Sequence, residues 1–151
     1  MRFTADRMLG KLAKKLRLLG IDTEYFKNVD EEAILKFCKE EGRILLTRDK
    51  ELYERALKNS IEAFLLKSDD WRSQLKAVHD KFRIHDKPYT RCSICNAPLV
   101  KVEKEAVKGK VPEYVYLTQD EFYECPKCHR IYWRGTHVEH MEEELRRVLK
   151  R

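Results

Sequence analysis

Gly42-Arg43-Ile44-Leu45-Leu46-Thr47-Arg48-Asp49 is the stretch that decides the fold class of this chain of 151 residues. Its apolar run, Ile44 to Leu46, follows a glycine that ends a helical pattern. Asp49 then stands before a second helical pattern, where an aspartate can cap free backbone N–H groups. The stretch therefore predicts a buried strand between two helices, which is the repeating unit of a parallel α/β sheet.

The first half of the chain repeats this alternation of strand and helix. Apolar and β-branched runs predict strands at residues 2–5, 23–26, 43–47 and 62–66. Apolar residues at helical spacing predict helices at residues 7–19, 30–42, 50–58 and 70–82. Because right-handed crossovers place such helices on both faces of a sheet, we expect an α/β fold with a parallel sheet flanked by helices.

The character of the sequence changes beyond a connector at residues 84–90, which contains Pro88. Short apolar and aromatic runs then predict strands at residues 114–116, 122–123 and 131–133, and a terminal helix covers about 137–150. We therefore expect two domains, residues 1–87 with the parallel sheet and residues 88–151 with a small β-rich module and a C-terminal helix.

Four of the five cysteines form two pairs, Cys92-Ser93-Ile94-Cys95 and Cys125-Pro126-Lys127-Cys128. Four thiolates in two such pairs give closed tetrahedral coordination of a structural Zn²⁺, as in zinc ribbons. Two disulfides or an iron–sulfur cluster are the alternatives, the first disfavoured by a reducing compartment and the second by the paired arrangement. His129 is a spare ligand at most, and Cys38 lies on an apolar helical face and is expected in the core.

Composition narrows the class of protein and of partner. The net charge of +6 and the pI near 9.0 favour a polyanionic partner. No apolar run approaches the roughly 18 residues of a membrane span, and the first residues lack the apolar core of a signal peptide. We expect a soluble, cytoplasmic protein that contacts no membrane.

Three of the predicted strands run into aspartates: Asp6, Asp49 and the pair Asp69/Asp70. Parallel strands bring their carboxyl ends to one edge of the sheet, so these side chains should share that edge. Close carboxylates repel one another unless a cation lies among them, and hard oxygen ligands suit Mg²⁺ or Mn²⁺. The pattern predicts a metal site able to cleave phosphodiester bonds.

Helix capping is the competing explanation for each acid. Asp6, Asp30 and Asp49 all precede predicted helices, and Asp69 or Asp70 precedes another. For any one residue, capping explains the aspartate better than a metal does. Three caps at one edge of one sheet shift the balance, and one carboxylate can both cap a helix and bind a metal.

The segments Asp6–Ala13, Leu16–Gly20 and Gly42–Asp49 resemble the PIN-like ribonuclease family, and in particular the C-terminal RNase domain of the Mut-seven exonucleases. The resemblance extends through both cysteine pairs to Tyr132-Trp133 and Gly135-Thr136-His137. It implies a PIN-like nuclease domain joined to a zinc ribbon. It also implies that RNA is the substrate and that Mg²⁺ or Mn²⁺ is the catalytic ion.

Residue roles carried over from this resemblance are expectations. The catalytic acids would be Asp6, Asp30 (with Glu31 as the alternative), Asp49 and Asp69 or Asp70, with Asp6, Asp49 and Asp69 as the Mg²⁺ or Mn²⁺ ligands. Arg7 and Met8 stand where many PIN domains have a small polar residue and Asn, which leaves the ligand set open. Arg7, Lys11, Lys14 and Arg48 would guide the RNA backbone, unless the lysines form only a solvated helix face.

A non-catalytic RNA-binding protein is the main alternative, with the acids acting only as caps. Its contacts would come from the ribbon, through Arg91, Lys127, Arg130, Trp133, Arg134 and His137. The competing interpretation of Tyr132 and Trp133 is that they pack the ribbon against the first domain. A toxin-type nuclease is disfavoured by the ribbon, and a DNA-binding regulator by the lack of a helix-turn-helix pattern.

Overall fold

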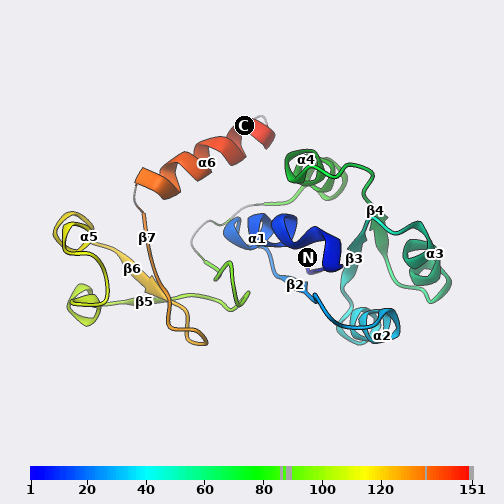
Figure 1. Ribbon diagram of the computed structural model, residues 1–151, viewed down its shortest axis with the longest axis horizontal. Helices are drawn as coiled ribbons and strands as arrows, with labels where there is room; N and C mark the ends of the chain where they lie inside the picture. Colours follow the sequence, from blue (N-terminus) through cyan, green and yellow to red (C-terminus); the bar gives the residue numbers. More distant parts are fainter. Residues whose placement is uncertain (86, 88–89, 135, 150–151) are drawn as a thin grey trace.

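A four-stranded parallel sheet forms the centre of the first half of the chain (Figure 1). Its strands are β1 (Phe3–Ala5), β2 (Thr23–Tyr25), β3 (Ile44–Thr47) and β4 (Ala63–Leu65), in the order β2-β1-β3-β4. The computed structural model describes the chain except for residues 86, 88–89, 135 and 150–151, and it describes only the backbone of residues 136–142. The α/β class and the parallel sheet expected from the sequence are confirmed.

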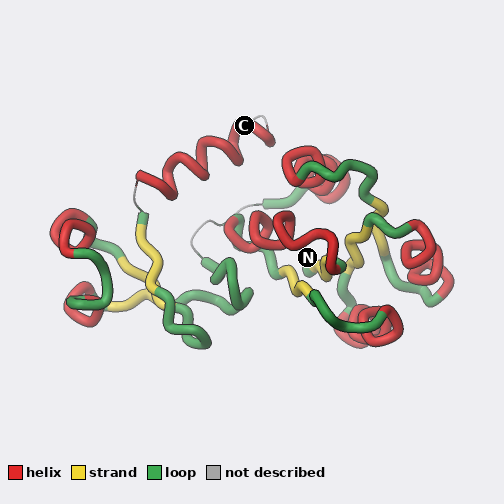
Figure 2. The backbone as a smooth tube through the Cα atoms, in the orientation of Figure 1, coloured by secondary structure: helices red, strands yellow, loops and turns green. Residues whose placement is uncertain are grey.

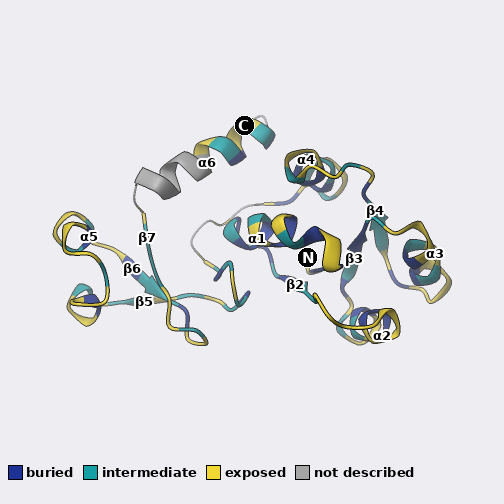
Figure 3. Cartoon of the chain, in the orientation of Figure 1, coloured by how far each residue is buried: buried dark blue, intermediate teal, exposed yellow. Residues whose placement is uncertain are grey.

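Helices cover both faces of this sheet. They are the 3-10 turn η1 (Arg7–Leu9), α1 (Gly10–Leu18), α2 (Glu31–Glu41), α3 (Lys50–Lys58) and α4 (Trp71–Phe82). Leu12 of α1 and Leu75 of α4 pack with Phe3 on one face. Leu35 of α2 and Leu52 of α3 pack with Leu45 on the other face, and the buried positions lie on the sheet side of these helices (Figure 3). The sheet is therefore enclosed on both sides, as alternating βα units require.

A second, antiparallel sheet of three strands forms the core of the ribbon. Its strands are β5 (Val100–Val102), β6 (Phe122–Glu124) and β7 (Ile131–Trp133), in the order β5-β6-β7. Between β5 and β6 the chain forms the 3-10 turn η2 (Lys104–Val107) and the short helix α5 (Glu113–Thr118). Val107, Val115 and Phe122 are its buried apolar residues, so the ribbon has a small core of its own.

The strand predicted at residues 114–116 is wrong, because Tyr114, Val115 and Tyr116 lie in α5. Pro112 precedes this helix and its carbonyl accepts hydrogen bonds from the amides of Val115 and Tyr116. In α5, Val115 is buried between two less buried tyrosines, and the same alternation is typical of a short strand. The sequence analysis missed the strand β5, although Val100, Lys101 and Val102 alternate as a strand does.

The terminal helix α6 (Thr136–Leu149) returns from the ribbon to the first half of the chain (Figure 2). Its buried residues Leu145 and Leu149 join the core formed by α1, α4 and the parallel sheet. The predicted connector includes residues 86, 88 and 89, which lie outside the described residues, so a domain boundary between 87 and 88 stays a prediction. In the described part of the chain, no helix is long and apolar enough to cross a membrane.

Candidate functional site

The carboxyl ends of all four parallel strands lie at one edge of the sheet, where the predicted acids follow them. Asp6 directly follows β1, and Asp49 comes two residues after the neighbouring strand β3. From β1 the chain continues to β2 on one side, and from β3 it continues to β4 on the other. The gap between β1 and β3 is therefore the switch point at which open α/β sheets bind ligands.

Hydrogen bonds connect the two central acids through Thr47, a residue that no sequence motif singles out. The hydroxyl of Thr47 donates to Oδ2 of Asp6, and the same Oγ1 accepts the amide of Asp49 at 3.0 Å. Oδ1 of Asp6 accepts the amide of Met8 at 3.0 Å, and Asp6 is only 5% exposed. Asp6 is thus a buried carboxylate held in one orientation beside Asp49.

Asp49 is also the N-terminal cap of α3, as the capping interpretation predicted. Its Oδ1 accepts the amides of Glu51 at 2.9 Å and Leu52 at 3.2 Å. Oδ2 of Asp49 has no hydrogen-bond partner among the described residues, and Asp49 is exposed. One carboxylate oxygen therefore serves the helix, and the other is free to contact a ligand.

Asp30 and its neighbours lie on the β2 side of the two central acids. Asp30 caps α2 by accepting the amide of Ala33 at 2.8 Å. Glu31 lies 3.8 Å from Arg55, and Glu32 forms a closer ion pair with the same guanidinium. Both glutamates thus pair with Arg55. Asp30 forms no ion pair with the described residues.

Asp69 and Asp70 lie on the β4 side and have different surroundings. Asp70 caps α4 through the amide of Ser73 at 3.3 Å and lies 3.9 Å from Arg72. Asp69 is exposed and forms neither a hydrogen bond nor an ion pair with the described residues. Asp69 is therefore the carboxylate of this pair that is available to a ligand.

These acids share an edge but do not converge on one point. Among the described residues, the four cysteines are the only group of three or more Cys, His, Asp or Glu side chains whose ligand atoms could hold one ion. Mg²⁺ usually keeps several waters and is bound through one or two carboxylates together with substrate phosphates. The buried Asp6 carboxylate and the free oxygen of Asp49 fit that kind of site in their donor chemistry, and their role as metal ligands stays a prediction.

The predicted RNA-guiding cations occupy two kinds of position. Arg7, Lys11 and Lys14 are exposed on η1 and α1, whereas Lys15 lies 4.5 Å from the centre of the Trp71 ring. Arg48 is half-buried between Thr47 and Asp49, and its Nε is buried without a hydrogen-bond partner among the described residues. Arg48 thus lies in the sequence between Thr47 and Asp49 and has no ion-pair partner among the described residues.

The four cysteines of the ribbon form a compact cluster. Their sulfur atoms all lie within 4.8 Å of one another, and Sγ of Cys92 is 3.7 Å from Sγ of Cys128. Zn–S bonds of about 2.3 Å at tetrahedral angles place neighbouring sulfurs about 3.8 Å apart. The cluster therefore fits zinc, as the sequence predicted.

The first knuckle (Cys92–Cys95) and the second knuckle (Cys125–Cys128) share one backbone arrangement. In each, the amide of the second cysteine donates to Sγ of the first, at 3.3 and 3.4 Å. The next residues, Asn96 and His129, both have left-handed backbones, with φ of 64° and 63°. His129 is not part of the metal-binding group, so the four cysteines suffice.

The thiols differ in their electrostatic surroundings. Loss of solvent and the neighbouring thiols raise the pKa of Cys95 to about 12. Loss of solvent also acts on Cys128, but hydrogen bonds from Arg130 and the neighbouring thiols lower its pKa to about 6. Four thiolates at this distance repel one another, so a bound cation is needed to hold all of them ionised.

The ribbon aromatics contact the ribbon itself. Trp133 packs against the core formed by Val107, Val115 and Phe122, and the hydroxyl of Tyr132 lies 3.0 Å from Sγ of Cys92. These contacts fill the core of the ribbon, and packing of the two rings against the first domain stays a prediction. The proposed nucleic-acid contact of His137 falls on a side chain outside the described residues. Cys38 is 1% exposed in the core, as expected.

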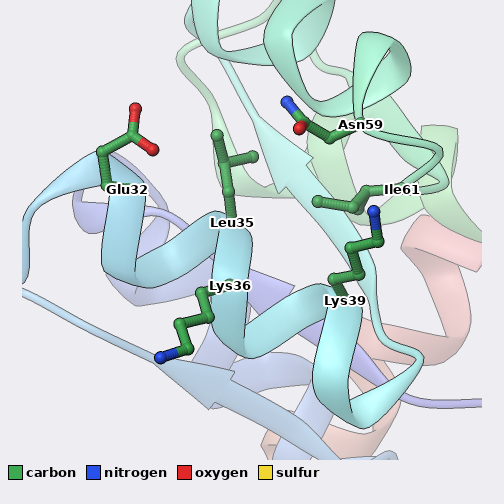
Figure 4. Close-up of a pocket in the computed structure, with 6 residues that line it drawn as sticks. All are labelled: Glu32, Leu35, Lys36, Lys39, Asn59 and Ile61. Carbon is green, nitrogen blue, oxygen red and sulfur yellow. The ribbon is translucent and has the colours of Figure 1, made fainter.

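A cavity of about 230 Å³ lies between α2 and the turn before β4 (Figure 4). It is lined by Glu32, Leu35, Lys36, Lys39, Asn59 and Ile61. Asn59 and Ile61 precede β4, so they lie at the opposite end of the strand from Asp69. The cavity contains none of the predicted site residues.

Comparisons with known proteins agree with the resemblance inferred from the motifs. A model of the family described as Mut7-C RNAse domain matches residues 1–145. The human protein named Exonuclease mut-7 homolog is 31% identical over 116 residues. That match covers 71% of this chain but only 13% of the human protein, so this chain spans a small part of its relative. No solved structure matches the chain.

Proposed function

This chain belongs to the Mut7-C RNAse domain family, and on that premise we propose that it hydrolyses phosphodiester bonds of RNA at the carboxyl edge of its parallel sheet. The observation that carries the proposal is the hydrogen-bonded path from Asp6 through Thr47 to Asp49. It fixes the buried carboxylate of Asp6 and links it to the backbone of Asp49, an exposed acid, at the switch point of the sheet. PIN-type chemistry, which the motif resemblance implies, is part of the proposal.

Asp6, Asp49 and Asp69 are the residues that would hold Mg²⁺ or Mn²⁺, together with waters and substrate phosphate, since the three carboxylates do not converge on one point. When bound, the ion lowers the pKa of a water ligand and offsets the negative charge of the phosphate. Thr47 fixes Oδ2 of Asp6, so this carboxylate keeps its orientation without the ion. The helix cap at Asp49 uses Oδ1 alone and leaves Oδ2 for a ligand.

Among the flanking acids, the contacts favour one residue of each candidate pair. Asp69 is preferred to Asp70, because Asp70 is held by the cap of α4 and by Arg72. Asp30 is preferred to Glu31 for the same kind of reason, since Glu31 faces Arg55. Asp30 and Asp69 follow the two edge strands and stand on either side of the central pair.

Arg48 is the residue we assign to the phosphate of the substrate. Its guanidinium lies beside the central acids in sequence, and its Nε has no hydrogen-bond partner among the described residues. Guanidinium groups form paired hydrogen bonds to phosphate oxygens, so the half-buried Arg48 would bind the phosphate through the exposed part of this group. Arg7, Lys11 and Lys14 are exposed on the adjoining turn and helix, where they would bind the backbone further along.

The test is cleavage of a labelled, structured RNA by the full chain with Mg²⁺ or Mn²⁺, compared with the same reaction in a chelator of these ions. DNA of the same sequence is the control for substrate class. Ion-dependent cleavage of RNA supports the proposal. Binding of RNA without cleavage under any of these conditions would instead favour the RNA-binding alternative, with contacts from exposed ribbon cations such as Lys127 and Arg130.

The zinc cluster has a structural role in this proposal. Closed four-cysteine coordination leaves no open position for a reacting water. The ribbon buries few large apolar residues, so the metal would supply much of its folding free energy.

A further inference from the structure

The two knuckles of the zinc centre have the same backbone but different surroundings. Asn96 and His129 stand at equivalent positions, each directly after the second cysteine of its knuckle. Asn96 is 4% exposed, whereas the side chain of His129 is 73% exposed, with its Nδ1 3.7 Å from Glu124. The geometry of the knuckle alone therefore does not explain why Asn96 is buried.

Asn96 is buried because it docks against the edge strand β2. Its Oδ1 accepts the amide of Thr23 at 3.0 Å. Its Nδ2 donates to the carboxylates of Asp22 at 2.7 Å and Glu24 at 2.8 Å. The side chain of Asn96 thus binds a backbone amide on the free edge of β2, where the sheet has no further strand. It joins the ribbon to the parallel sheet.

Arg17 of α1 makes the second connection, directly to the first knuckle. Its Nη1 donates to the carbonyls of Ser93 at 3.1 Å and Ile94 at 3.0 Å, the two residues between the cysteines. Its Nε donates to the carbonyl of Thr23 at 2.7 Å, and Arg17 is only 7% exposed. One buried guanidinium therefore holds the first knuckle and the strand β2 together.

The charge of Arg17 also suits the zinc centre. Four thiolates around Zn²⁺ carry about two net negative charges. Burial lowers the pKa of Arg17, while the carboxylate of Glu24 and the thiols of Cys92 and Cys95 act in the opposite direction. Groups that hydrogen-bond around a metal centre orient its ligands and tune its affinity.

We propose that Arg17 is a positioning residue for the zinc centre, and that zinc binding and docking of the first knuckle on β2 form one coupled event. Metal occupancy then controls the order of the edge strand of the parallel sheet. β2 ends at Tyr25, whose hydroxyl donates to the carbonyl of Arg7 at 2.7 Å. The coupled strand therefore reaches the residue next to Asp6, although the coupling itself does not depend on the proposed nuclease activity.

Amide hydrogen exchange of the full chain, with zinc bound and after its removal by a chelator, measures this coupling. The reporter is the amide of Thr23, which Asn96 binds, and the reference is the amide of Leu45 in β3, which donates to Glu62 at 2.9 Å. We expect metal removal to lower the protection of Thr23 more than that of Leu45. Equal protection of Thr23 with and without zinc would overturn the proposal.

If the metal-free chain unfolds as a whole, Thr23 and Leu45 lose protection together, and hydrogen exchange does not test the coupling. The second measurement therefore starts from the folded, zinc-loaded protein and follows the rate of zinc transfer to a chromophoric chelator. Arg17→Gln removes the charge, and Arg43→Gln is the matched control. Arg43 is 6% exposed and binds Asp22 and the carbonyl of Phe3, both at 2.9 Å, but makes no hydrogen bond to the described residues of the first knuckle.

We expect Arg17→Gln to transfer zinc about tenfold faster than wild type, which is the low end of the affinity loss seen for outer partners of metal ligands. Arg17→Lys, which keeps the charge, should restore part of the difference. Arg43→Gln should transfer zinc more slowly than Arg17→Gln, because Arg43 reaches the first knuckle only indirectly, through Asp22 and Asn96. A wild-type rate for Arg17→Gln, or equal acceleration in the Arg43 control, would contradict a specific role for Arg17.

Discussion

The hydroxyl of Thr47 donates a hydrogen bond to the buried carboxylate of Asp6, between two neighbouring strands of the parallel sheet. Its oxygen simultaneously accepts the amide of Asp49, so the two central acids are tied to one side chain. A valine has the same branched shape without the hydroxyl, and serine has the hydroxyl without the methyl group. These two substitutions separate the hydrogen bonds from the packing.

Thr47→Val should lower RNA cleavage while zinc content stays at the wild-type level. It should also destabilise the fold by about 1–3 kcal/mol, because a buried carboxylate and an amide lose their partner. Cleavage rates and urea unfolding of both variants provide the measurement. Thr47→Ser should stay close to wild type in activity, and a fully active Thr47→Val would show that the hydrogen-bonded path is dispensable.

Asp69→Asn and Asp70→Asn distinguish the two acids that follow β4. Asparagine caps helices about as well as aspartate, so Asp70→Asn should keep the cap of α4. We expect cleavage to fall in Asp69→Asn and to change little in Asp70→Asn. The reverse order in a side-by-side cleavage assay would assign the role to Asp70.

Low pH should reduce the free energy of unfolding, because Asp22 becomes protonated. Burial raises the pKa of Asp22, but hydrogen bonds from Arg43 and Asn96 outweigh it and hold that pKa below the usual value. A depressed folded-state pKa gives stability that is fully present above the unfolded value of about 3.9 and is lost as the pH falls through the folded value. Stability should therefore decline below about pH 4.

Asp22→Asn should cost about 3 kcal/mol at neutral pH, because it removes the nearer and less exposed of the two carboxylates that pair with a buried guanidinium. The gap in unfolding free energy between wild type and variant should narrow as the pH falls from neutral into the acid range. Glu41→Gln is the control, since Glu41 also binds Arg43, at 3.3 Å, but its side chain is 42% exposed. Urea unfolding across this pH range checks the expectation, and a gap that stays constant would contradict it.

Lys11 and Lys14 should contribute to the salt dependence of RNA binding. Replacing both by glutamine should reduce the slope of log Kobs against log salt by about 0.7 for each phosphate that these lysines neutralise, the value for single strands. Lys36→Gln with Lys39→Gln makes the same charge change on α2, which covers the other face of the sheet. Fluorescence anisotropy with labelled RNA measures both slopes, and equal slopes in the two double variants would count against a specific RNA path along α1.

The first half of the fold could be predicted because its signals are local. Asp30 and Asp49 cap the predicted helices through their side chains, and Gly42 ends α2 with a left-handed backbone at φ of 63°. The strands between them are short apolar runs, so the apolar pattern and the helix caps predict the same boundaries of helices and strands. The predicted edge of acids follows from this order of elements, because parallel strands all end on the same side.

What the sequence does not reveal depends on contacts between distant residues. Arg17 resembles the other cations of a basic helix, but it is buried because residues 93 and 94 supply carbonyls to it. Asn96 carries no sequence signal, since its role depends on the free edge of β2. Thr47 belongs to a predicted strand, and only the pairing of β1 with β3 places it against Asp6.

Cleavage of labelled RNA by wild type and Asp49→Asn, each loaded with zinc and assayed in Mn²⁺ or Mg²⁺, tests the central claim most directly. Asparagine preserves the cap of α3 and removes only the charge, so a capping role alone predicts little change. We expect wild type to cleave and Asp49→Asn to lose cleavage while its unfolding midpoint and zinc content stay the same. Undiminished cleavage by Asp49→Asn would contradict an acidic centre at this edge of the sheet.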